Sequence, residues 1–333
     1  MEHKQELETL YLSWKNRPPV LIESLENSSA SPRSYFRIYS ETESFIGAYN
    51  SDIKENRAFF HFTNTFRIKG IHVPDLYCTS ENEKYYLLED LGDTNLLACL
   101  KKQGESEFII QLYKKAIDEL FKLQIYGNEE IDFKTFAYPR PEFDSQSILW
   151  DLNYFKYYFL KISGITFDEQ LLENDFHLLA KEISQQAWKG FMFRDFQARN
   201  IHIRNEEVWF IDYQGGRKGP MLYDLVSLLY QASANLSTPL REELKNYYEE
   251  NLTRYFHFSH ADFEQAYYLL VLIRITQTLG TYGFRGLIEK KPYFINSIPL
   301  ALINLDNIIH NQEIKVETNY FINILKQVSQ LKF

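Results

Sequence analysis

The sequence has few of the residues that build disulfide frameworks or zinc modules. Its 333 residues include two cysteines, Cys78 and Cys99, and neither belongs to a CxxC pair or to a cluster of cysteine and histidine. This pattern argues against a disulfide-stabilised scaffold and against a structural zinc site.

Long hydrophobic runs are missing as well. The first ten residues are charged and lack the apolar segment of a signal peptide, and no run of about 18 apolar residues follows that would cross a bilayer. We therefore expect a soluble, cytoplasmic protein with no membrane as partner.

Basic residues are fewer than acidic residues. The chain has 36 Lys and Arg against 45 Asp and Glu, which gives a formal net charge of −9. Nucleic acids and anionic membrane surfaces recruit clustered basic residues, so neither is expected as the main partner. A nucleotide is still compatible, because one or two local cations and a metal ion are enough to hold a triphosphate.

Aromatic residues are abundant, with 24 Tyr and 26 Phe, and hydrophobic residues make up 45% of the chain. The length suggests two domains or one bilobal unit. Alternating residues predict strands at 34–40, 44–49 and 84–89, in the first quarter of the chain. Helical spacing predicts helices at 2–14, 56–69, 107–126, 147–162, 175–187, 240–256 and 262–280, and one from Tyr223, with short strands at 200–203 and 208–211.

This order predicts an α+β, bilobal protein-kinase-like fold. A small β-rich lobe of residues 1–91 would bind a nucleotide, and a larger α-helical lobe of residues 92–333 would carry the catalytic loop and the acceptor site. The junction is expected near residues 89–93.

Three polar residues in the second half have the spacing of a phosphotransfer centre. Asp195 and Asn200 lie five positions apart, and Asp212 ends the strand after them. Kinases use one carboxylate to orient the acceptor hydroxyl and take its proton, and an Asn and a second Asp to hold Mg²⁺ on the phosphates. Asp224, at the start of an apolar helix, either braces this loop or is an ordinary N-terminal helix carboxylate.

The runs around these residues resemble a known group. F-R-D-F-Q-A-R-N, F-I-D-Y-Q-G-G-R-K-G-P and Y-D-L-V-S-L-L are similar to the aminoglycoside phosphotransferase and choline kinase-like superfamily. Within it, the layout is most similar to the anomeric sugar kinases that act on N-acetylmuramate and N-acetylglucosamine. The resemblance extends in order over nearly the whole chain.

The resemblance implies a role for each matching residue. Asp195 would be the catalytic base, Asn200 and Asp212 would bind Mg²⁺, and ATP would lie between the lobes. The backbone from Glu89 to Leu91 would meet the base, and the turn around Ser31 would cover the phosphates.

Two departures from kinases stand out. Phe193 occupies the position where kinases usually have His, and the strand at 45–50 has no Lys to hold the α- and β-phosphates. We expect Arg37 to supply the cation, with Arg33 as the second candidate and a surface Arg as the plain alternative. Glu55, which resembles the kinase helix glutamate, has little weight without a Lys partner.

Four residues are candidates for a sugar acceptor, because sugars are bound by carboxylates and amides that bridge hydroxyls. They are Asp151, Asn153, Arg199 and Gln214. Arg217 and Lys218 either meet an acidic substituent of the sugar or form a solvated basic turn, which is slightly favoured.

The expected function is transfer of the γ-phosphate of ATP to a sugar hydroxyl, with an amino sugar favoured. Choline, ethanolamine and aminoglycoside kinases use the same fold, and the composition does not exclude them. A nucleotide-binding regulator with weak catalysis is the remaining alternative, since Phe193 and the missing Lys would suit it.

Overall fold

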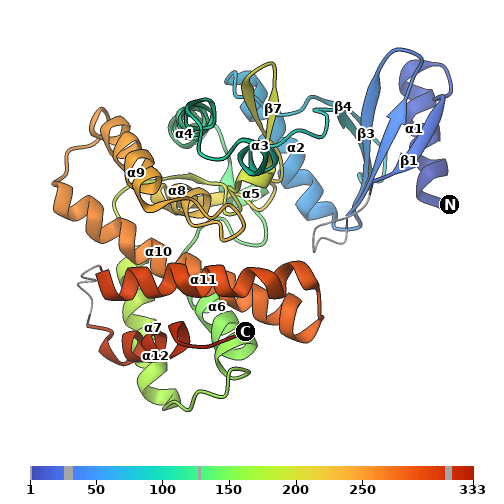
Figure 1. The fold of residues 1–333 in the computed structure, drawn as a ribbon. Coiled ribbons are helices and arrows are strands. Elements are labelled where there is room, and N and C mark those ends of the chain that lie inside the picture. The colour runs from blue at the N-terminus through green and yellow to red at the C-terminus, as the bar shows by residue number, and fades with distance from the viewer. Residues whose placement is uncertain (1, 26–32, 127–128, 312–316) are drawn as a thin grey trace.

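The computed structural model describes residues 2–25, 33–126, 129–311 and 317–333. Its smaller part is built on a five-stranded antiparallel sheet with the strand order β1-β2-β3-β5-β4 (Figure 1). The strands are β1 (Leu21–Ser24), β2 (Ser34–Tyr39), β3 (Ser44–Tyr49), β4 (Leu76–Thr79) and β5 (Tyr85–Glu89).

The expected alternation along β2 is confirmed. Phe36 and Ile38 are buried on one face of the sheet, in a small apolar cluster with Leu7 of α1 (Glu2–Lys15). Tyr35 points to the opposite face and lines a cavity. The sheet therefore packs on α1 on one side and offers its other side to the rest of the molecule.

Helix α2 (Ile53–Ile68) connects the sheet to the larger part. It begins three residues earlier than expected, because the Asp52 side chain caps it, and it ends at Ile68, two residues before Gly70, whose φ is +71°. Phe59 of α2 stacks on Tyr213 with ring centroids 5.1 Å apart. Both rings belong to one hydrophobic core that extends through the two parts.

The larger part is mainly helical and surrounds two short ribbons, β6-β9 and β7-β8 (Figure 1). The ribbon strands are β6 (Lys189–Met192), β7 (Ile201–Arg204), β8 (Glu207–Phe210) and β9 (Arg217–Pro220). The helices are α3 (Leu96–Gln103), α4 (Glu107–Tyr126), α5 (Phe133–Phe136), α6 (Ser145–Phe155), η2 (Lys156–Leu160), α7 (Glu169–Ser184), η3 (Ala198–Asn200), α8 (Leu222–Leu229), α9 (Thr238–Thr253), α10 (His260–Tyr282), η4 (Gly283–Ile288), α11 (Pro292–Asn311) and α12 (Asn319–Ser329).

Helix α10 crosses close to α6 because it carries glycine at the contact. A Cβ on Gly280 of α10 would lie 2.9 Å from the nitrogen of Phe155 in α6, and one on Gly283, the first residue of η4, would lie 1.9 Å from the carbonyl oxygen of Tyr158 in η2. Any side chain at these positions would push the helices apart. This contact fixes the distance between polar residues on α6 and on α10.

The α+β architecture, with a small sheet lobe and a large helical lobe, is confirmed. Helix α7 begins at Glu169 rather than 175, because Asp168 caps it. The sequence analysis missed β1, β6, β9, α3, α11 and α12. The division at residues 91 and 92 stays a prediction. Within the described ranges, no helix is both long and apolar enough to cross a membrane.

Candidate active site

The loop between β6 and β7 carries Asp195, and a buried carboxylate holds its start. Asp224, fully buried at the start of α8, accepts hydrogen bonds from the backbone N–H groups of Phe193 (2.6 Å) and Arg194 (2.9 Å). Burial raises the pKa of Asp224 to about 7 against the opposing effect of these bonds. The expectation that Asp224 braces the loop is confirmed.

Two more contacts fix the rest of the loop. The Ser227 hydroxyl donates to the Arg194 carbonyl at 3.2 Å, and the Ala198 N–H donates to the Gln231 side-chain oxygen at 2.8 Å. Arg194 has a φ of +78°, in the left-handed region that costs energy for a residue with a Cβ. The bonds to Asp224 and Ser227 on either side hold it there.

Phe193, at the position of the kinase His, is buried among aromatic rings. It packs edge-on against Phe191, Phe196, Phe210 and Tyr213, with centroids 5.3 to 6.5 Å apart. The ring supports the loop by apolar packing.

Asp195, Asn200 and Asp212 come together as their spacing predicted. The Asn200 amide donates to the Asp195 carbonyl at 2.9 Å and to Asp212 Oδ2 at 3.2 Å. Because the amide nitrogen is used in this way, the Asn200 side-chain oxygen is the atom that can reach a metal. Gln214 donates to Asp212 Oδ1 at 2.8 Å, so it belongs to the same group.

This group fits a magnesium ion that is bound together with phosphates. Gln214 Oε1 is a buried acceptor beside Asp212 with no hydrogen-bond partner. Burial raises the pKa of Asp212, so its carboxylate is stabilised by a nearby cation. The described residues contain no cluster of three His, Cys, Asp or Glu that would hold a metal alone. Mg²⁺ commonly takes one or two protein carboxylates and completes its shell with phosphate and water oxygens.

Asp195 is held from the other side by α10. Arg274 Nη2 donates to Asp195 Oδ1 at 3.2 Å, and the Asp195 side chain remains 49% exposed. Burial favours the neutral carboxyl, but the charges of Arg274, Arg194 and Arg199 outweigh it, so the pKa of Asp195 lies below its ordinary value. Asp195 is therefore an ionised, accessible carboxylate.

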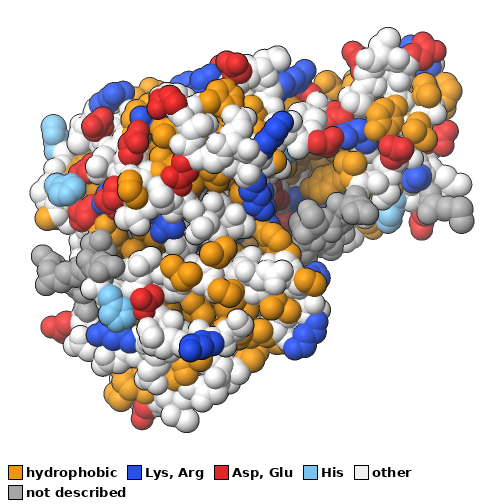
Figure 2. Space-filling model, in the orientation of Figure 1, with side chains coloured by type: hydrophobic (Ala, Val, Ile, Leu, Met, Phe, Trp, Pro, Cys, Tyr) orange, Lys and Arg blue, Asp and Glu red, His pale blue; other side chains and the backbone are white. Residues whose placement is uncertain are grey.

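A cavity of about 470 Å³ lies between the sheet and this group, and the surface is hollowed between the lobes (Figure 2). We call it the inter-lobe cavity. Its lining includes Tyr35, Tyr86, Leu88, Glu89, Leu91, His202, Asn200 and Asp212. Glu89 and Leu91 thus line the inter-lobe cavity, and their role in binding the base stays a prediction. Ser31 lies outside the described residues.

Arg33, rather than Arg37, lies beside the metal-binding candidates. The buried Arg33 guanidinium is 3.1 Å from Glu55 and 4.0 Å from Asp212 Oδ1. Arg37 instead forms ion pairs with Asp90 (2.7 Å) and Asp93 (2.8 Å) at the junction of the lobes. These contacts favour Arg33 over Arg37 as the cation near the metal-binding candidates, and the choice between the two stays a prediction; Glu55 has in Arg33 the cationic partner that the sequence analysis did not find.

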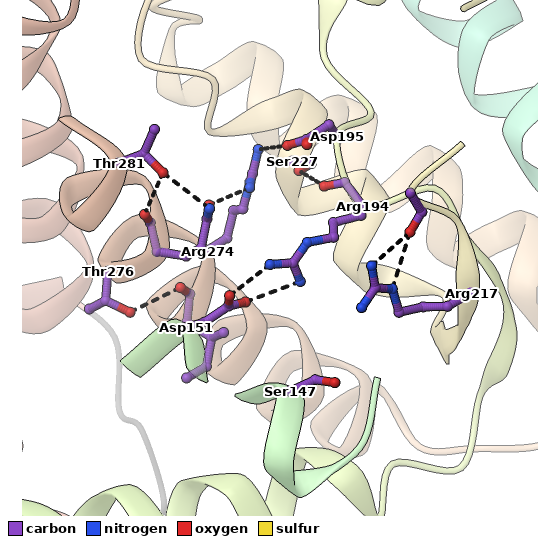
Figure 3. Close-up of polar contacts among 12 residues, drawn as sticks. Ser147, Asp151, Arg194, Asp195, Arg217, Ser227, Arg274, Thr276 and Thr281 are labelled. Carbon is purple, nitrogen blue, oxygen red and sulfur yellow. Dashed lines mark hydrogen bonds and ion pairs between the residues drawn. The ribbon is translucent and has the colours of Figure 1, made fainter. Parts of the chain in front are cut away.

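The acceptor candidates do not form one group. Asp151 on α6 accepts from Arg194 Nη2 at 2.7 Å and from Nη1 at 3.3 Å (Figure 3). Asn153 donates to the Leu149 carbonyl of its own helix, and at two positions from Asp151 it lies about 200° around that helix. Asn153 therefore does not share a site with Asp151. Arg199 lines the inter-lobe cavity.

Three buried or half-buried arginines lie around Asp195, and we call Arg194, Arg217 and Arg274 the arginine cluster (Figure 3). The sequence analysis quoted the run that contains Arg194 but gave neither Arg194 nor Arg274 a role. Their contacts join segments up to 79 positions apart, so no local pattern signals them.

A family model described as the phosphotransferase enzyme family matches residues 25–258, well over half of the chain. The chain belongs to the phosphotransferase enzyme family. The expected family is thereby confirmed, together with the kinase class of enzyme.

Curated relatives within this family carry one name. The chain is 32% identical to the N-acetylmuramate/N-acetylglucosamine kinase of Neisseria meningitidis over 167 residues, 49% of this chain and 47% of that protein. This match spans about half the length of the relative. A kinase of the same name from Pseudomonas aeruginosa is 24% identical over 295 residues, 86% of this chain and 83% of that protein.

Solved structures share the fold. Amicoumacin kinase hAmiN, in complex with AMP-PNP and Ca²⁺, superposes with a TM-score of 0.67 at 11% identity, covering 96% of this chain and 97% of that one. Choline kinase LicA from Streptococcus pneumoniae gives 0.61 at 12% identity, covering 91% and 99%.

Proposed function

We propose that this phosphotransferase moves the γ-phosphate of ATP to a hydroxyl of an amino sugar, with the anomeric hydroxyl of N-acetylmuramate or N-acetylglucosamine as the favoured acceptor. The observation that carries the proposal is the convergence of Asp195, Asn200 and Asp212 at the edge of the inter-lobe cavity. The sugar follows from the names of the curated relatives. Because ATP is the donor, we place the reaction in the cytoplasm.

The nucleotide would occupy the inter-lobe cavity, with its base against the backbone of Glu89 to Leu91. Asn200 and Asp212 would hold Mg²⁺, which neutralises charge on the phosphates. Arg33 would face the phosphates and so replace the missing strand lysine, with Glu55 keeping its guanidinium in place. An Arg in this role keeps its charge when buried and offers several N–H donors.

Asp195 would orient the acceptor hydroxyl and take its proton as the new oxygen–phosphorus bond forms. The bond from the γ-phosphorus to the β-phosphate oxygen breaks, and ADP leaves with that electron pair. Arg274 keeps Asp195 ionised and fixes its direction. On the sugar, Asp151 would accept hydroxyl hydrogen bonds.

Cationic acceptors fit less well. Choline and aminoglycosides carry positive charge, and the arginine cluster would repel it. An acidic groove or aromatic cage would be expected for such acceptors.

An acceptor screen tests the proposal. The protein and Mg-ATP would be incubated with N-acetylmuramate, N-acetylglucosamine, choline or an aminoglycoside, with ADP release as the readout and NMR of the product. The proposal expects turnover with the amino sugars and a phosphate on the anomeric oxygen. Stabilisation by Mg-ATP without turnover on any acceptor would favour the regulator, and turnover on choline alone would contradict the sugar.

A further inference from the structure

Arg217 differs from the other two members of the arginine cluster. Arg194 pairs with Asp151 at 2.7 Å and Arg274 pairs with Asp195 at 3.2 Å. Arg217 is 5% exposed and donates through Nε and Nη2 to one carbonyl oxygen, that of Gly215, at 3.1 and 3.0 Å. Within the described part of the chain, no carboxylate lies within 4.0 Å of its guanidinium.

A buried guanidinium without a counter-charge is costly. Water is lost from the charge, and one carbonyl satisfies only part of its five N–H donors. Burial, with a further contribution from Arg194, lowers the pKa of Arg217 to about 10. The guanidinium is still charged at neutral pH, but its charged form is less stable here than it would be in water. An anion beside Arg217 would relieve this cost.

The position of Arg217 connects it to the reacting atoms. It opens β9, directly after the turn 213–216, and its register partner is Met192 at the end of β6. The catalytic loop leaves β6 at this point, so Arg217 lies beside the start of the segment that carries Asp195. Figure 3 shows Arg217 facing the side on which Arg194 reaches Asp151.

We infer that Arg217 forms a subsite for an anionic substituent on the acceptor sugar, and that this chain therefore prefers an acidic amino sugar to its neutral counterpart. The inference rests on the proposed function, because it assumes that the acceptor binds beside Asp195. The chemistry recognised is a carboxylate, which a guanidinium binds through paired, charge-assisted hydrogen bonds.

Three acceptors isolate this carboxylate. N-acetylglucosamine lacks the lactyl group, N-acetylmuramate carries it as an acid, and the methyl ester of N-acetylmuramate carries it without charge. We expect the wild-type kcat/KM to be about 10- to 100-fold higher for the acid than for the ester, the range of one charge-assisted contact. Equal values for acid and ester would overturn the inference, whatever the variants do.

Variants then assign the preference to Arg217. R217Q should reduce kcat/KM for the acid by the same factor and leave the neutral sugar within about threefold, whereas R217K should keep part of the preference. K218Q is the matched control, because it removes one positive charge from the adjacent, exposed residue, and it should preserve the preference. An equal loss on acid and neutral sugar in R217Q would mean that Arg217 only holds the Gly215 turn, and the inference would be wrong.

If the proposed function is wrong, the set of acceptors that are turned over will differ. Turnover on choline or an aminoglycoside alone would contradict both the amino sugar and the anionic subsite. Turnover restricted to another acidic acceptor, lost in R217Q but not in K218Q, would contradict the amino sugar and support the subsite.

Discussion

The inter-lobe cavity and the arginine cluster lie on the two sides of Asp195 and have opposite charge. The lining of the cavity has four carboxylates, Glu89, Asp90, Asp93 and Asp212, and one arginine, Arg199. The arginine cluster has three guanidiniums and two paired carboxylates, Asp151 and Asp195. We therefore expect a triphosphate to need a divalent cation in order to bind in the first region, whereas the second region supplies positive charge from the protein.

The largest effect is expected from removing that cation or its main ligand. Asp212→Ala, or EDTA with the wild type, should lower turnover on the order of 10³-fold and abolish the rise in Tm caused by Mg-ATP. Turnover would be followed by ADP release and binding by thermal shift. Unchanged stabilisation by ATP in EDTA would contradict the claim that the cavity depends on a metal.

Asp224 should matter for both regions because it holds the loop between them. Asp224→Ala leaves the N–H groups of Phe193 and Arg194 without their acceptor, and we expect the free energy of unfolding to fall by about 2–4 kcal/mol, with a lower kcat. Urea unfolding and ADP release would measure the two effects. Asp175→Ala is the control, because Asp175 accepts from the Phe321 N–H far from the loop and should affect stability but not kcat.

The same carboxyl predicts a pH dependence. Since burial raises the pKa of Asp224 to about 7, above the ordinary value of 3.8 for an Asp carboxyl, the folded state favours the protonated form. Its contribution to stability is then full below about pH 4 and is lost as the pH rises through about 7. The difference in unfolding free energy between wild type and Asp224→Ala should narrow over that window, and a difference that widened would contradict this assignment.

Replacing Arg33 tests which arginine contacts the phosphates of ATP in the inter-lobe cavity. We expect Arg33→Met to raise the KM for ATP about 10- to 100-fold, as for the loss of one charge-assisted contact, with less effect on the KM for the sugar. Arg37→Met is the matched control, because Arg37 is paired with Asp90 and Asp93. A larger rise in Arg37→Met than in Arg33→Met would restore the original assignment.

The smallest effect is expected at Phe193. Phe193→His buries a polar ring among aromatic side chains and should lower the unfolding free energy by about 1–3 kcal/mol. We expect kcat to change by no more than a few fold, because the ring packs under the loop and Asp224 holds the backbone. A large gain in kcat would show that the phenylalanine limits catalysis.

Contacts were predicted best from the sequence where the residues that meet lie close together along the chain. Asp195, Asn200 and Asp212 lie within eighteen positions on one loop and ribbon, so their spacing alone predicted that they meet. Arg33, the residue before β2, and Arg37 within β2 have the same parity as Tyr35, so alternation along the strand did not distinguish them. It did not show that one end of the strand lies near Asp212 and the other near Asp90, because that depends on how the lobes pack.

The arginine cluster was harder to predict for the same reason. Its members come from the catalytic loop, β9 and α10, and their partners from α6 and the loop. The approach of α10 to α6 depends on Gly280, and that of η4 to η2 depends on Gly283; in the sequence these are only two glycines in a helical pattern. Side-chain pairs formed by such packing leave no periodic signal.

The central claim is that the inter-lobe cavity binds Mg-ATP while Asp195 acts on the acceptor hydroxyl. Its most direct test is Asp195→Ala. Asp195 contacts Arg274 and is the proposed base for the acceptor hydroxyl, whereas the candidate metal ligands are Asn200 and Asp212. The account predicts that turnover on the best amino sugar falls about 10²- to 10⁴-fold, while the Kd for Mg-ATP measured by calorimetry stays within about threefold of the wild type. Full turnover in Asp195→Ala, or loss of Mg-ATP binding equal to that in Asp212→Ala, would contradict it.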